Sequence, residues 1–261
     1  MSDEVASPGV GSVMMSLAEP TPGFEIAYNR WYEDDHLHAA GTSAPWIFAA
    51  QRWVATKALR DMRRYSTPAV IDPPTDGCYL VTLWNSPGHA GDYRRWVTKA
   101  LAQLRQDGRA FDQRKLVLNA HVGHVGTVYR DRQQPADVHA LDCGYAGLVL
   151  EIVEAINSDA LLSWLINAHV PSRLDDSAAG QCVIFRGEPP ETKEDPTRIF
   201  PAASDNRFYL LWFMDVDPAQ CFGELFRDEE ATLKGINASL TLLAPFLRTH
   251  RGSNDYVDQL R

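Results

Sequence analysis

The feature of this sequence that most restricts its fold is an internal repeat. Both halves show the order strand, helix, strand, strand, helix, strand at similar spacing. In the first half we predict strand 13–17, helix 24–38, strands 49–56 and 78–85, helix 91–106 and strand 116–121. In the second half we predict strand 145–153, helix 159–169, strands 182–185 and 207–216, helix 219–233 and strand 240–249, interrupted near Pro245.

Matching residues at matching positions support the repeat. Trp31 precedes His36 by five residues near the end of one predicted helix, and Trp164 precedes His169 in the same way. The run from Tyr79 to Trp84 also matches the second-half run from Phe208 to Trp212. The sequence therefore predicts an α+β fold made of two tandem ferredoxin-like βαββαβ units.

The repeat also suggests where the chain divides. We expect one ferredoxin-like unit at residues 1–135 and a second at 136–261, with the polar segment 130–142 as the linker. Segments 60–76 and 188–206 are rich in proline and charge, so we interpret them as insertions between the middle strands of each unit.

Charge and hydropathy exclude several classes of partner. The net charge is −9 and there is no lysine- or arginine-rich run, so neither nucleic acid nor a membrane surface is an expected partner. No apolar run approaches the roughly 20 residues that span a bilayer, and residues 1–11 lack the pattern of a signal peptide. We therefore expect a cytoplasmic protein, whose four separate cysteines are buried free thiols.

The run Tyr28 to Leu37 resembles a known family motif. It matches the N-x-W-Y-x-x-x-H-L stretch of dimeric α/β-barrel proteins, in particular the EthD-like branch, whereas the second half keeps only Trp164, His169, Val170 and Pro171. In that superfamily two ferredoxin-like units pair their sheets into a barrel, and each unit holds a pocket between its sheet and its helices. The resemblance implies an intramolecular, pseudo-dimeric barrel whose first half is the candidate active half.

The resemblance does not settle the function. Members include cofactor-independent monooxygenases, polyketide cyclases, muconolactone-type isomerases and aldoxime dehydratases, and more distant members hold haem, so function has to be argued from the pocket. The family commonly has proline two residues after the motif histidine, where this chain has His38. This departure affects any role carried over to that position.

The first helix presents an unusual polar and aromatic face. Tyr28, Tyr32 and His36 recur every four residues and Trp31 lies on the adjoining row, so these side chains share one side of the helix. Histidine titrates near neutral pH, which makes His36 the candidate acid/base group. Tyr32 is a candidate hydrogen-bond donor to a developing anion, and Asn29 is a further polar contact. The alternative is that His36 only caps its helix.

A lining for a small apolar ligand can also be predicted. Besides the aromatic residues of the first helix, candidate substrate-binding residues are His38, Trp46, Phe48, Trp53, Trp84 and His121. His121 and His124 should point to opposite faces of their strand.

We expect no metal, because the acidic run 33–35 is typical of a solvated helix face and no histidine pair has the spacing of a zinc site.

These features predict an acid/base enzyme. It would act without a cofactor on a small hydrophobic substrate, aromatic, polyketide-like or terpenoid-like, by isomerisation, dehydration, cyclisation or oxygenation. One alternative is a non-catalytic small-ligand-binding protein. Another is a haem protein with His36, His121, His124 or His169 as axial ligand. Pairing into a homodimer is left open.

Overall fold

The computed structural model describes residues 9–187 and 206–261. The first-half strands are β1 (Ser12–Pro20), β2 (Ile47–Val54), β3 (Arg64–Tyr65), β4 (Tyr79–Asn85) and β5 (Arg114–Tyr129), and its helices are α1 (Glu25–Trp31), α2 (Lys57–Asp61) and α3 (Ala90–Gln106). The second-half strands are β6 (Gly147–Ala155), β7 (Ala179–Gly187), β8 (Arg207–Met214) and β9 (Ala238–Arg248), and its helices are α4 (Ser158–Trp164), α5 (Val170–Leu174), α6 (Phe222–Leu225) and α7 (Glu229–Gly235).

The strands form one antiparallel sheet that closes on itself. Its order is β2-β4-β1-β5-β7-β8-β6-β9-β3, and β2 also pairs with β9. Each half supplies four strands in the same relative order, β2-β4-β1-β5 and β7-β8-β6-β9, as two βαββαβ units require. The junction between β5 and β7 extends from Val122↔Gly187 to Tyr129↔Gln181, whereas β2 and β9 meet only at Trp53↔Arg248 and Val54↔Leu247. The predicted fold class is confirmed.

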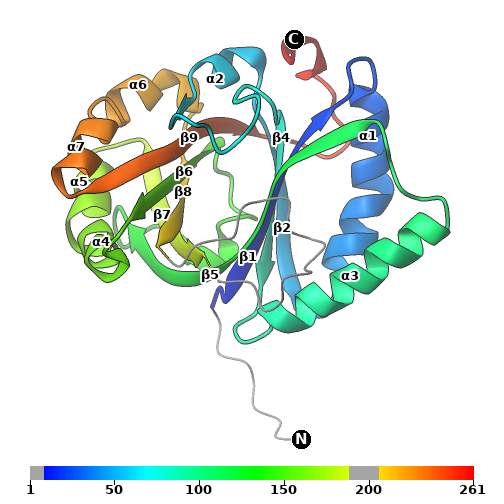
Figure 1. Ribbon diagram of the computed structural model, residues 1–261, viewed down its shortest axis with the longest axis horizontal. Helices are drawn as coiled ribbons and strands as arrows, with labels where there is room; N and C mark the ends of the chain where they lie inside the picture. Colours follow the sequence, from blue (N-terminus) through cyan, green and yellow to red (C-terminus); the bar gives the residue numbers. More distant parts are fainter. Residues whose placement is uncertain (1–8, 188–205) are drawn as a thin grey trace, which may run out of the picture.

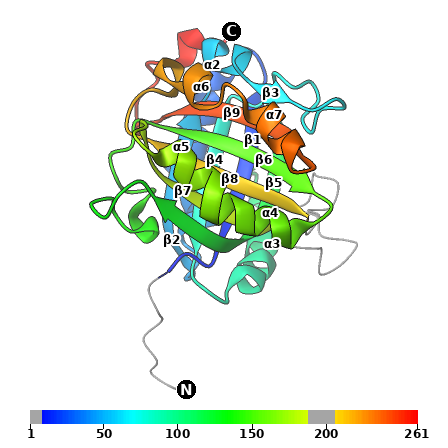
Figure 2. The same ribbon diagram turned by 90° about the vertical axis from the view of Figure 1, so that its left-hand side faces the viewer.

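Helices cover the two outer sides of this ring. Figure 1 shows α1 and α3 on one side and α4 to α7 on the other, and Figure 2 shows α4, α5 and α7 over β6 and β8. Side chains alternate along each strand, so Val13, Met15 and Leu17 of β1 face the barrel interior while Met14 and Ala18 face α1 and α3. The molecule therefore has three apolar layers, namely one shared barrel interior and one helix–sheet core in each half.

Several local predictions from the sequence are wrong. β9 continues through Pro245 without a break. On one edge of β9, β3 pairs with residues before Pro245 and β2 with residues after it, so the missing N–H of the proline removes no hydrogen bond on that edge. The predicted helix 219–233 is divided into a 3₁₀ turn (Pro218–Gln220), α6 and α7. Trp84 faces the barrel interior and Trp212 the helix side, so the two tryptophans are not equivalent. Apart from Asn206, the predicted insertion 188–206 lies outside the described residues.

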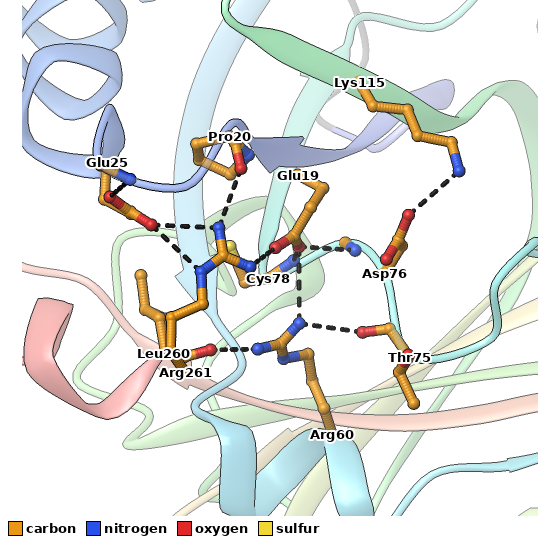
Figure 3. Close-up of polar contacts among 12 residues, drawn as sticks. Glu19, Pro20, Glu25, Arg60, Thr75, Asp76, Cys78, Lys115, Leu260 and Arg261 are labelled. Carbon is orange, nitrogen blue, oxygen red and sulfur yellow. Dashed lines mark hydrogen bonds and ion pairs between the residues drawn. The ribbon is translucent and has the colours of Figure 1, made fainter.

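The end of β1 carries a buried ionic cluster (Figure 3). Glu19 Oε2 accepts hydrogen bonds of 2.9 Å from the backbone N–H groups of Gly77 and Cys78, and lies 3.6 Å from Arg60 Nη1. Arg261 also pairs with Glu19, while Arg60 donates to the Leu260 carbonyl. The cluster holds residues 260 and 261 against the first half.

Across the described ranges, no helix combines the length and apolar character that a membrane crossing requires.

Candidate functional site

A cavity of about 80 Å³ lies in the first half, between the outer face of the sheet and the helices. Leucine and valine side chains line much of it, and its polar lining consists of Ser16, Tyr32, His36, Tyr93, Arg114, Asn119 and His121. A wider pocket of about 350 Å³ adjoins it and shares part of this lining, including His36, Arg114 and Asn119. Together they form a small inner cavity and a wider outer pocket, and Trp31 lines the outer pocket.

The helical path after α1 directs His36 into this cavity. The helix continues beyond Trp31 through two π-helical turns, Tyr32–His36 and His38–Thr42, in which each turn is wider than an α-helical turn. The His36 ring stacks on Trp31 with 4.2 Å between ring centroids and lies 5.2 Å from the Tyr32 ring. π-Helical turns are frequent at functional sites, and here they place the motif histidine at the junction of both pockets.

Burial sets the protonation states at the site. Loss of hydration, reinforced by the positive charge of Arg114, lowers the pKa of His36 from 6.5 to about 3, so its imidazole is neutral near pH 7. Burial likewise raises the pKa of Tyr32 well above its ordinary value, so that its phenol keeps its proton. The cavity therefore combines a neutral proton acceptor, a phenolic donor and the Arg114 cation, all three of which line it.

A buried network supports this helix from behind. Arg52 Nη1 lies 2.7 Å from Glu33 Oε1, Arg52 Nη2 donates to Asn29 Oδ1 at 3.0 Å, and the guanidinium lies 4.8 Å from the centre of the Tyr32 ring. Asn29 also donates to Asn254 and does not line the cavity. The prediction of a solvated acidic run is wrong for Glu33, because only 3% of its side chain is exposed.

The structure brings only some of the predicted site residues to the cavity. Tyr32, His36 and His121 line it, and Trp31 lines the outer pocket. Six further residues proposed for the lining lie elsewhere. Five of them are Tyr28 in the helix–sheet core, Trp53 and Trp84 in the barrel interior, Phe48 on the surface, and His38 beside Thr42.

Trp46 completes the proposed set, and it stacks on His89 with 5.7 Å between ring centroids instead of lining the cavity. The interior tryptophans are excluded from the cavity because alternate residues of a strand face opposite sides of the sheet. His124 illustrates the same rule. It faces the other side of the sheet from His121, and its Nε2 atom lies 3.6 Å from Asp137 Oδ2.

Sequence reasoning missed four polar residues of the cavity, Ser16, Tyr93, Arg114 and Asn119. The pairing of β1 with β5 places Ser16 opposite Asn119 and Met14 opposite His121. Asn119 lies two residues before His121, so a period-two reading of β5 could have found it. Arg114 and Ser16 carry no comparable signal, because their side-chain positions depend on strand pairing between distant segments.

No protein-family model matches the sequence, and no curated protein does. Solved structures do match in fold. They include an anthrone oxidase-like protein (TM-score 0.52, 10% identity, covering 95% of this chain and 97% of that chain), and a chlorite dismutase from Candidatus Nitrospira defluvii (0.52, 9%, 92% and 91%). DypB in complex with manganese is a third (0.56, 12%, 99% and 98%). The chain thus has the dimeric α+β-barrel fold, with both units supplied by one polypeptide.

These similarities correct the prediction that no cofactor takes part, because chlorite dismutases and DyP peroxidases depend on haem. The described residues nevertheless do not fit haem in either half. Trp31 stacks on one face of the His36 ring, and the inner cavity beside that ring holds only about 80 Å³, which leaves no room for a macrocycle, whereas a smaller ligand can extend into the outer pocket of about 350 Å³. In the second half, His169 Nε2 lies 3.0 Å from Glu229 within a packed helix–sheet core. No step is therefore derived through haem.

Proposed function

We propose that the protein is an enzyme that removes a proton from a small aromatic or polyketide-like substrate at the first-half cavity. The observation that carries this proposal is the neutral, buried imidazole of His36 beside the protonated phenol of Tyr32. A neutral imidazole accepts a proton, and the phenol donates a hydrogen bond to the oxygen on which negative charge develops. Both groups are present in the required protonation state before the substrate binds.

The other side chains of the cavity suit the same step. Arg114 supplies a positive charge that stabilises an anion, and Ser16 and Asn119 offer polar contacts to substrate oxygens. Leu101 and Leu116 line both the cavity and the outer pocket, which suits an aromatic ring system that extends from one to the other. As negative charge forms on the substrate, attraction to it raises the proton affinity of His36.

The first substrates to test are phenolic and anthrone-type aromatic compounds, because one of the similar structures is anthrone oxidase-like. Product formation is followed by chromatography and mass spectrometry for the wild type, H36Q and Y32F. We expect H36Q to lower kcat by about 10²- to 10⁴-fold and Y32F by about 10²- to 10³-fold. The matched control is H38Q, because His38 is exposed and its ring lies 3.2 Å from Thr42 Oγ1, outside the cavity.

Other outcomes would point elsewhere. Turnover at the wild-type rate in both H36Q and Y32F would refute the role of His36 and Tyr32. Tight binding without conversion would favour a small-ligand-binding protein. A Soret band on addition of haem, lost in H36Q, would place haem at the cavity instead. Association with a second copy of the chain stays a prediction, which light scattering tests.

A further inference from the structure

The second half carries a buried polar cluster where the first half has its cavity. Glu151 is the fifth residue of β6, as Ser16 is the fifth residue of β1, and His169 ends its π-helical turn as His36 does. Glu229 of α7 completes the cluster. The three side chains are at most 3% exposed, and one ligand-type atom from each lies within 4.8 Å of the others.

One oxygen of Glu151 accepts a hydrogen bond and one oxygen of Glu229 faces a guanidinium, while the second oxygen of each carboxylate faces the cluster. Trp212 Nε1 donates to Glu151 Oε2 at 2.8 Å, while Glu151 Oε1 has no hydrogen-bond partner within the described part of the chain. Arg173 Nη2 lies 3.1 Å from Glu229 Oε2, and Glu229 Oε1 lies 3.0 Å from His169 Nε2 without hydrogen-bond geometry. Donors that fix one oxygen and leave the other available are typical of the partners behind metal ligands.

Charge balance favours a cation at this position. The two buried carboxylates, Glu151 and Glu229, face the Arg173 guanidinium and the His169 imidazole, and a divalent cation among them would offset the cost of burying both carboxylates in ionised form. One imidazole nitrogen with two carboxylate oxygens is a ligand set suited to zinc, iron or manganese. In tetrahedral coordination, bonds of about 2.0–2.2 Å place the ligand atoms roughly 3.3 to 3.6 Å apart, so the widest spacing in the cluster would contract by about 1.3 Å on binding.

A surface pocket borders the cluster on the His169 side. The pocket, of about 380 Å³, is lined by His169 and Arg173, together with Trp164 and Thr232, but not by the fully buried Glu151 and Glu229. Trp164 stacks on the His169 ring with 4.4 Å between centroids, which fixes the orientation of the imidazole. An ion would therefore enter from this pocket by a movement of the His169 ring.

We propose that Glu151, His169 and Glu229 bind one divalent first-row transition metal ion in the second half. The ion sits between β6 and the helix layer, on the opposite side of the barrel from the first-half cavity. The site is independent of the proposed reaction at His36. Its loss would leave the fold of the first-half cavity in place.

The test uses the full chain, freed of any affinity tag and stripped with a chelator. Zn²⁺ binding is measured by calorimetry and Co²⁺ binding by visible absorption, for the wild type, E151Q and E229Q. We expect one ion per wild-type chain, Co²⁺ d–d bands, and affinity at least 10-fold weaker in either variant. The control is E154Q, because Glu154 lies on the same strand but pairs with Arg207.

The wild type alone decides the matter if the variants do not fold. Zn²⁺ should then raise the Tm of the wild type while Mg²⁺ does not, because the ligand set includes an imidazole. The proposal is overturned if the wild type shows neither d–d bands nor a Tm shift. It is also overturned if E151Q and E229Q fold and bind Zn²⁺ as tightly as the wild type, since the ion would then lie elsewhere.

Discussion

At the scale of single residues, burial of His36 affects stability as well as chemistry. Its pKa of about 3 in the folded chain is below the ordinary 6.5, so the unfolded chain binds more protons between these values. The free energy of unfolding should therefore fall as the pH drops from about 6.5 towards about 3, by up to about 1.4 kcal/mol per pH unit. Urea titrations at a series of pH values measure this dependence.

The H36Q variant provides the comparison for that prediction. Glutamine does not titrate, so the acid-dependent loss of stability over this pH range should be smaller than in the wild type by the His36 contribution. H38Q should keep the wild-type dependence, because His38 is exposed. Equal pH slopes in the wild type and H36Q would mean that His36 is not buried in its neutral form.

The sequence predicted part of the site at this scale. Tyr32 and His36 were accessible to prediction because a four-residue period places them on one helix face, and both line the cavity. Trp84 was misplaced because β4 is buried on both faces, and Trp53 because the end of β2 is too, so burial along these strands does not indicate which side a residue faces. The buried Glu151 cluster combines three segments distant in sequence, and no local pattern marks it.

At the scale of secondary-structure elements, the contact between the first helix and β2 depends on Arg52. Replacing Arg52 by Gln would remove the buried cation that pairs with Glu33 Oε1, although Arg30 and the Gly252 N–H still contact Oε2, and would also remove the cation from the Tyr32 ring. We expect a loss of about 3–5 kcal/mol in the free energy of unfolding, measured by chemical denaturation. Replacing Arg30, whose side chain is 38% exposed, should cost less than about 1 kcal/mol.

A double variant separates the two causes. If the unpaired carboxylate is the main cost, E33Q/R52Q should be more stable than R52Q alone, because no buried charge remains unpaired. An R52Q chain as stable as the Arg30 variant would contradict the role given to this ion pair.

Element boundaries were predictable where the apolar period was long and regular. The prediction of a helix at 91–106 is close to α3, whose buried residues include Tyr93, Val97 and Leu104. The prediction failed at 219–233, where the chain breaks near Phe226 because tertiary packing of that ring outweighs helix propensity. The extension of β5 to Tyr129 was missed because its second part pairs with β7 of the other half.

At the scale of the whole molecule, both halves contribute to the barrel interior. Phe213 of β8 lies 6.0 Å from Trp53 and 6.3 Å from Trp84, measured between ring centroids. Replacing Phe213 by Ala should therefore destabilise both halves together, by about 3–5 kcal/mol. Coincident unfolding transitions by far-UV circular dichroism and tryptophan fluorescence would support one cooperative unit.

Two separate transitions, of which F213A shifts only one, would contradict this expectation. They would instead indicate that residues 1–135 and 136–261 unfold as independent domains, a division that stays a prediction. The matched control is F226A, because Phe226 belongs to the helix–sheet core of the second half alone.

The filled barrel interior has a further consequence for transport. The first-half cavity and the Glu151 cluster lie on opposite outer sides of the ring, and Trp53, Trp84 and Phe213 are among the side chains packed between them. Interiors packed in this way leave no tunnel for a molecule larger than water. A compound released on one side would reach the other only by diffusion through bulk solvent, so neither half can channel an intermediate directly to its neighbour.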